Sequence, residues 1–146
     1  MNKCLNAVAE LKGSKEHPNL YGTVKFLQKK NFVLVKACIT GLPKTETGFF
    51  GFHIHSGEDC LGEEFLGSQG HFNPTDTPHP QHSGDLPPLL LCNSGAYMTV
   101  ATNRFRVKDI IGRTVIIHSM PDDFTTQPSG NAGVKIACGI IKPGML

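Results

Sequence analysis

Two histidines separated by a single residue stand in the segment GFHIH, residues 51–55. In a β-strand, residues two apart point to the same face, so His53 and His55 would project together while Phe52 and Ile54 turn into a core. Neutral imidazoles placed side by side are good ligands for a transition metal. For this segment alone, a polar strand face that carries two histidines is an equally open interpretation.

A second group of metal-binding residue types follows in HPQHSGD, where His79, His82 and Asp85 supply two imidazoles and a carboxylate. Together with His71 they would provide the four nitrogen and oxygen ligands that zinc prefers. The alternative interpretation is a proline-rich surface loop. However, residues 56–85 have little apolar content and form an unusually long irregular stretch. A bound metal would explain how this stretch keeps one shape.

Short alternating or β-branched segments recur between turn residues, which is typical of strands. We expect eight strands, at residues 5–12, 21–28, 32–40, 48–55, 89–92, 97–101, 114–118 and 134–141. Only residues 107–111 offer a turn of helix. The pattern predicts an all-β sandwich or barrel, with irregular loops at 56–85 and 119–133.

The composition limits the alternatives. A length of 146 residues suits one domain, and sixteen glycines, ten prolines and 18% charged residues argue against long helices. A formal charge of +2 indicates neither a nucleic-acid nor a membrane partner. No apolar run approaches the ~18 residues that span a bilayer. The first residues lack the pattern of a secretory leader, so the expected location is the cytoplasm, where the five cysteines would by default be reduced.

Five motifs together resemble the copper/zinc superoxide dismutase family. They are GFHIH, GHFNP (70–74), HPQHSGDLPP (79–88), GRTVIIH (112–118) and GNAGVKIACGII (130–141). They stand in that family's order, and the likeness is greatest to bacterial members with a short zinc loop. The resemblance implies an eight-stranded Greek-key β-barrel, or sandwich, with a long metal-binding loop and a second active-site loop. It also implies an enzyme that converts superoxide to oxygen and hydrogen peroxide.

The resemblance assigns metal ligands position by position. It implies copper ligands His53, His55, His71 and His118, and zinc ligands His71, His79, His82 and Asp85. His71 would then bridge the two metals, taking up a proton in one half of the cycle and returning it in the other. Asp122 would join the non-metal nitrogens of His53 and His79, and His17 is left as a surface residue.

The resemblance also pairs Cys60 with Cys138 in a disulfide that the family keeps even in the cytoplasm. Cys4, Cys38 and Cys92 have no partner in the family pattern. We expect these three to be free thiols, with Cys38 buried.

One position departs from the family pattern, because Lys135 stands where an arginine usually precedes the ACG segment. Lysine keeps the positive charge that attracts superoxide but loses the planar fork of donors, so we expect activity lowered by up to about tenfold. Ser129 is expected to line the channel. Residues 124–133 carry no charge, which predicts weak electrostatic steering and a shallow salt dependence.

Two other functions stay open. A metal-binding, chaperone-like member of the same fold would hold metals without dismutation, and only Lys135 favours it. A zinc-stabilised, adhesion-like sandwich would leave His53, His55 and His118 unexplained. The implied partner is superoxide as a small-molecule substrate, and a homodimer is open alongside a monomer.

Overall fold

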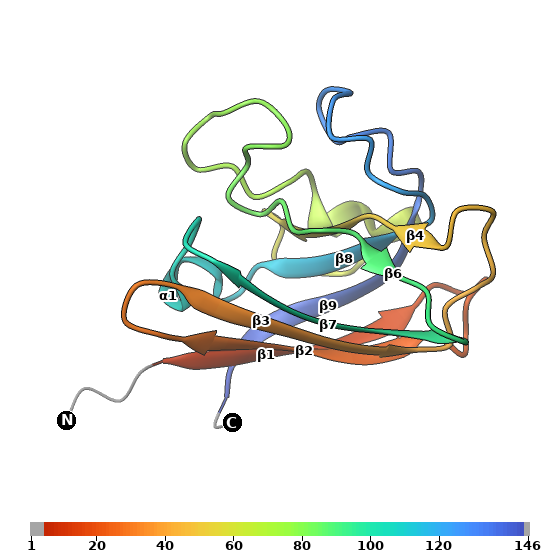
Figure 1. Ribbon diagram of the computed structural model, residues 1–146, viewed down its shortest axis with the longest axis horizontal. Helices are drawn as coiled ribbons and strands as arrows, with labels where there is room; N and C mark the ends of the chain where they lie inside the picture. The colour runs from red at the N-terminus through yellow and green to blue at the C-terminus, as the bar shows by residue number, and fades with distance from the viewer. Residues whose placement is uncertain (1–4, 145–146) are drawn as a thin grey trace.

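The computed structural model describes residues 5–144, and these residues form an all-β fold (Figure 1). Seven strands make one curled antiparallel sheet in the order β5-β8-β9-β1-β2-β3-β7, and β4 and β6 form a two-stranded ribbon. The elements are β1 (Asn6–Gly13), β2 (Tyr21–Gln28), β3 (Val33–Thr40), β4 (Phe49–Phe50), β5 (Phe52–His55), β6 (Leu89–Leu90), β7 (Gly95–Thr102), the helical turn α1 (Val107–Ile110), β8 (Thr114–His118) and β9 (Lys135–Pro143). The all-β, Greek-key class expected from the sequence is confirmed.

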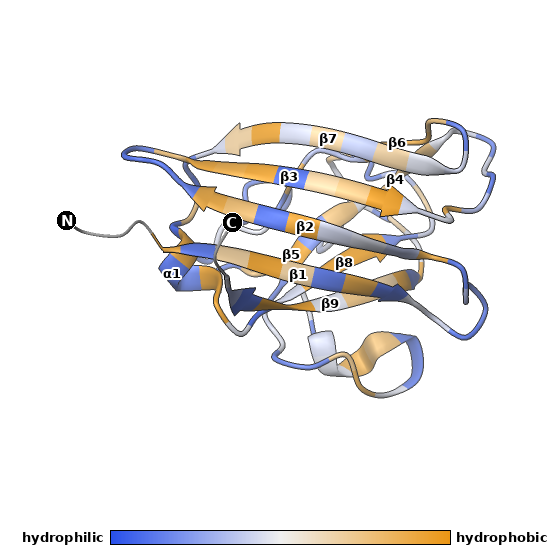
Figure 2. Ribbon diagram, turned by 90° about the horizontal axis from the view of Figure 1, so that it is seen from below, coloured by the Kyte–Doolittle hydropathy of each residue, from blue (hydrophilic) through white to orange (hydrophobic). Residues whose placement is uncertain are grey.

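Burial alternates along β1, β2 and β3, as expected for strands with one face on a core. Figure 2 shows these strands side by side with β7 and β9, with apolar and polar residues mixed along each ribbon. In contrast, every residue of β5 and β8 is buried. One face of these two strands meets the core, and the two long loops cover the other.

The strand expected over residues 48–55 is divided at Gly51, so the structure has β4 and β5 in its place. Phe49 and Phe50 pair with β6, whereas β5 pairs with β8. Gly51 N–H donates to the Met120 carbonyl at 2.8 Å, and a Cβ built on Gly51 would lie 2.8 Å from Ala132 Cβ. A glycine is needed here because the chain passes this tightly from the ribbon into the sheet. The other strands lie within two residues of the expected bounds.

Both long loops rise on the same side of the sheet, away from the described chain ends (Figure 1). The first of them contains a short helical segment, Glu63–Ser68, which the sequence did not indicate. Cys60, just before this segment, forms a disulfide with Cys138 of β9, so the expected pairing is confirmed.

The prediction that Cys38 is buried is wrong. Val35, Ala37 and Ile39 of β3 face the core, so the alternation turns Cys38 outward, and it is an exposed free thiol. Cys92 is also exposed and free, and Cys4 lies outside the described residues. His17 is half-buried, with Nδ1 3.2 Å from Ser14 Oγ.

Among the described residues, no helix is both long enough and apolar enough to cross a membrane.

Candidate metal centre

Four histidines meet where β5 and β8 lie side by side beneath the loops. His53 and His55 come from β5, His118 ends β8, and His71 is brought in from the loop by a backbone bridge to His55. One ring nitrogen from each lies within 4.8 Å of the others. We refer to these residues as the four-histidine group.

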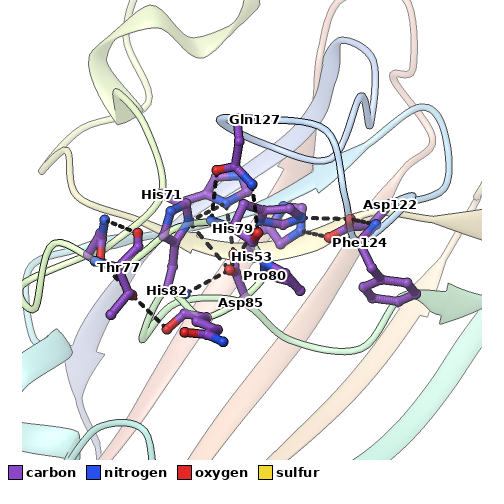
Figure 3. A network of polar contacts seen from close by, with 12 residues as sticks. His53, His71, Thr77, His79, Pro80, His82, Asp85, Asp122, Phe124 and Gln127 are labelled. Atoms are coloured by element: carbon purple, nitrogen blue, oxygen red, sulfur yellow. Dashed lines mark hydrogen bonds and ion pairs between the residues drawn. The ribbon is translucent and has the colours of Figure 1, made fainter.

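A second group shares His71 with the first. It consists of His71, His79, His82 and Asp85, with their ligand atoms again within 4.8 Å of one another. Asp85 is central, because its carboxylate oxygens lie 2.8 Å from His71 Nδ1, 3.1 Å from His79 Nδ1 and 3.3 Å from His82 Nδ1 (Figure 3). We refer to these residues as the aspartate group.

Three buried ring nitrogens in these groups have no hydrogen-bond partner among the described residues: His53 Nδ1, His71 Nε2 and His79 Nδ1. His79 Nδ1 is near Asp85, but not in a geometry that makes a hydrogen bond. Buried polar atoms without partners are rare in folded proteins. Imidazole nitrogens and a carboxylate are donors that suit copper and zinc, so the two groups fit these metals.

Asp122 joins the two groups through the opposite ring nitrogens. Its Oδ2 lies 2.8 Å from His53 Nε2 and its Oδ1 2.8 Å from His79 Nε2 (Figure 3). A carboxylate accepts hydrogen bonds, so both Nε2 atoms carry the proton and both Nδ1 atoms keep a lone pair for a metal. The backbone N–H of Phe124 donates to Oδ1 at 2.8 Å and holds the carboxylate in place.

Backbone carbonyls orient the remaining two histidines of the four-histidine group. His55 Nδ1 donates to the Gln69 carbonyl at 2.7 Å, and His118 Nδ1 donates to the Gly133 carbonyl at 3.3 Å. With the protons on Nδ1, the Nε2 atoms of His55 and His118 are bare and lie 3.2 Å apart. Two lone pairs this close repel unless a cation lies between them.

Burial keeps three members of the four-histidine group, His53, His55 and His118, neutral. It lowers the pKa of His53 to about 4, against the hydrogen bond to Asp122, and the pKa of His118 to about 3. Burial also lowers the pKa of His55 well below its usual value. For Asp122, burial opposes ionisation, but hydrogen bonds from His53 and His79 outweigh it and lower the pKa of the carboxyl. Neutral imidazoles beside an anionic carboxylate are the protonation states that metal binding needs.

A cavity of about 530 Å³ opens beside His55, His71 and His118. Lys135 and Ser129 are among its lining residues. Lys135 Nζ donates to Ser68 Oγ and to the Gln69 carbonyl, each at 2.8 Å. Burial lowers the pKa of Lys135, and the carboxylate of Glu64 partly opposes that shift.

Comparisons with known proteins agree with this geometry. Residues 20–141 match the family model described as copper/zinc superoxide dismutase. The chain belongs to the copper/zinc superoxide dismutase family. It is 33% identical to superoxide dismutase [Cu-Zn] 2 of Aquifex aeolicus, over 94% of this chain and 87% of that protein.

Two other bacterial relatives lie in the same range. Identity to the Legionella pneumophila superoxide dismutase [Cu-Zn] is 35%, over 86% of this chain and 80% of that protein. Identity to the Caulobacter vibrioides superoxide dismutase [Cu-Zn] is 30%, over 83% of this chain and 78% of that protein. The bacterial likeness expected from the motifs is thus confirmed.

Several residues around this superoxide dismutase-type centre were not identified from the sequence. Gln69 acts through its backbone carbonyl, which no side-chain pattern reveals. Gln127 exchanges two hydrogen bonds with the backbone of His79, at 2.9 and 2.7 Å, and so ties the two loops together. Arg104 donates to the Pro80 carbonyl at 2.6 Å. Glu63 and Glu64 line the cavity beside Lys135, and their adjacency in the sequence was the available signal.

Proposed function

We propose that this protein is a superoxide dismutase, which converts two superoxide anions and two protons to oxygen and hydrogen peroxide. The observation that carries the proposal is His71, whose Nδ1 faces the aspartate group while its buried Nε2 has no partner among the described residues. A single imidazole placed between two groups of metal-ligand type is suited to link a redox metal to a structural one.

In the proposed centre the four-histidine group holds copper and the aspartate group holds zinc. Copper bound there would supply reversible one-electron chemistry, and zinc would have no redox role. His71 Nε2 takes up a proton in the first half and gives it to the peroxide product in the second. Asp122 keeps the protons of His53 and His79 on Nε2 throughout, so these rings keep one orientation.

Lys135 is proposed to attract superoxide into the cavity. Its ammonium group is held by Ser68 and Gln69 at the cavity wall, close to the four-histidine group. We propose a rate up to about tenfold below that of an arginine-bearing centre, because a lysine offers one point charge in place of a planar fork. Ser129 lines the same cavity and is proposed to contact the entering anion.

The alternative is a chaperone-like member of the same fold that binds metal without dismutation, and Lys135 is the residue that favours it. Metal analysis and an activity assay on one sample separate the two functions. The enzyme requires about one copper and one zinc per chain, together with cyanide-sensitive removal of superoxide. Zinc alone after reconstitution with copper, or both metals without superoxide removal, would contradict the proposal.

Cytoplasmic location and a homodimer are further parts of the proposal. Cell fractionation tests the location, and analytical ultracentrifugation tests the mass in solution.

A further inference from the structure

Acidic residues predominate in the loop segments around the metal centre. Between Lys44 and Arg104 the sequence contains no lysine or arginine. The same stretch contains seven acidic residues: Glu46, Glu58, Asp59, Glu63, Glu64, Asp76 and Asp85. The second loop, residues 119–133, adds Asp122 and Asp123 and again no cation. Among the described residues that line the 530 Å³ cavity, Lys135 is the one lysine or arginine.

Glu63 and Glu64 line the same cavity as Lys135, and both are exposed. They do not belong to either group of metal-ligand type, and neither forms an ion pair of 4 Å or less with a described residue. Glu64 is nevertheless close enough to Lys135 for its charge to act on the ammonium group. An anion that enters through this cavity therefore meets two carboxylates and one ammonium group.

The backbone holds Glu64 at this place. Glu64 and Phe65 are consecutive residues in the left-handed region, with φ of 49° and 56°. This conformation costs about 1 kcal/mol or more for a residue other than glycine, so the surrounding structure must hold it. Phe65 lines a different cavity, beside Cys60 and Cys138, while its carbonyl is 3.5 Å from Lys135 Nζ. The left-handed turn therefore anchors Phe65 on the disulfide side and leaves Glu64 on the channel side.

We propose that Glu63 and Glu64 form an acidic rim that opposes Lys135 and slows the entry of superoxide and other small anions. The proposal rests on the proposed function for its substrate, but it concerns charge at the channel mouth and not the chemistry at the metals. Exposed charges act over about 10 Å at 0.1 M salt, a range that spans residues lining one cavity. Salt should screen the rim as well as Lys135, so the wild-type rate should stay level or rise as ionic strength increases.

The test replaces both glutamates by glutamine, which keeps their size and removes their charge. For the double variant Glu63→Gln, Glu64→Gln we expect kcat/KM about threefold above wild type at about 10 mM ionic strength. The two proteins should converge at about 0.5 M, where the charges are screened. Glu46→Gln makes the same charge change at an exposed residue outside the cavity, and its rate should equal that of wild type.

A second measurement does not depend on turnover. Azide is a small anion that can be titrated into the copper-loaded protein by visible absorption. We expect about threefold tighter azide binding in the double variant at low salt, and equal affinity at high salt. Equal rates and equal azide affinities at low salt would overturn the acidic rim, and so would a difference that persists unchanged at high salt. A protein that binds copper and azide but removes no superoxide would contradict the proposed function. The difference in azide affinity between wild type and the double variant would still test the acidic rim.

Discussion

The two groups of the metal centre are built in different ways. Three members of the four-histidine group stand on β5 and β8, whose backbones are paired in register and whose residues are all buried. In the aspartate group all four members come from the loop between β5 and β6, and polar contacts hold it. A ligand on a strand gets its direction from the hydrogen-bonded sheet, whereas a ligand on a long loop needs partners of its own.

Specific contacts hold the loop between β5 and β6. Asp85 lies against the three histidines of its group, Gln127 hydrogen-bonds with the backbone of His79, and the disulfide from Cys60 to Cys138 anchors the start of the loop. Asp122 connects the aspartate group on the loop to the histidines on the strands, because it hydrogen-bonds with both His79 and His53. We therefore expect the histidines on β5 and β8 to keep their arrangement when metal is lost. The aspartate group, in contrast, should depend on metal for its shape.

The largest expected effect is acid instability of the metal-free protein, caused by the strand-borne histidines. Burial lowers the pKa of His53 to about 4 and of His118 to about 3, while an unfolded histidine titrates near 6.5. Between these values the unfolded chain binds protons that the folded chain does not. The free energy of unfolding should therefore fall as the pH drops from about 6.5 towards 4, by about 2 kcal/mol per histidine at pH 5.

Urea denaturation of the metal-free protein at pH 8, 6.5 and 5 measures this fall. The variant His118→Gln removes one of these buried histidines, so its free energy of unfolding should depend less steeply on pH. An unfolding free energy that is the same at pH 8 and pH 5 would show that the strand-borne histidines are not desolvated as the structure has them.

Next in size is the loss of a ligand on a strand. His55→Ala should abolish copper binding and lower activity by at least about a hundredfold, because one of the two facing Nε2 atoms is gone. Because the sheet positions the other residues, zinc content and the circular dichroism spectrum should stay close to wild type. The control is His17→Ala, at a half-buried histidine outside both groups. Loss of zinc together with copper in His55→Ala would contradict the separation of the two halves.

The sequence predicts the ligands on the strands more completely than the ligands on the loop. Alternation along a strand is a local property, so the common direction of His53 and His55 was evident from GFHIH. The same alternation explains Cys38. Thiols generally prefer the interior, but the position of Cys38 in β3 turns it to the exposed face.

The loop could be predicted only through its motifs. Its ligand types were visible in HPQHSGD, but its path depends on carbonyl acceptors such as Gln69 and on contacts such as Gln127 with His79. Such backbone contacts leave no periodic signal in the sequence. The division of the strand at Gly51 was missed for a related reason, because it depends on Met120 and Ala132, far away in the chain.

A smaller effect is expected when the loop loses its central ligand. Asp85→Asn removes the charge that lies against three histidines, and zinc affinity should fall by about ten- to a hundredfold. Without firmly bound zinc, amides of residues 56–85 should exchange hydrogen faster, while those of β1, β2 and β3 keep their protection. Asp76→Asn is the matched control, since Asp76 is an exposed residue of the same loop outside both groups. Unchanged exchange in the loop of Asp85→Asn would show that metal does not shape it.

The smallest effect concerns Lys135, which connects a strand to the loop. It stands on β9, and its ammonium group donates to Ser68 and Gln69 of the loop. Lys135→Arg should raise kcat/KM by up to about tenfold, because a guanidinium can satisfy the loop acceptors and still present a donor to the anion. Lys135→Met keeps the length of the side chain without its charge and should lower kcat/KM. The two variants together separate the effect of the charge from the effect of the planar donor geometry of arginine. If arginine left the rate of superoxide removal unchanged while methionine lowered it, the charge alone would account for this residue.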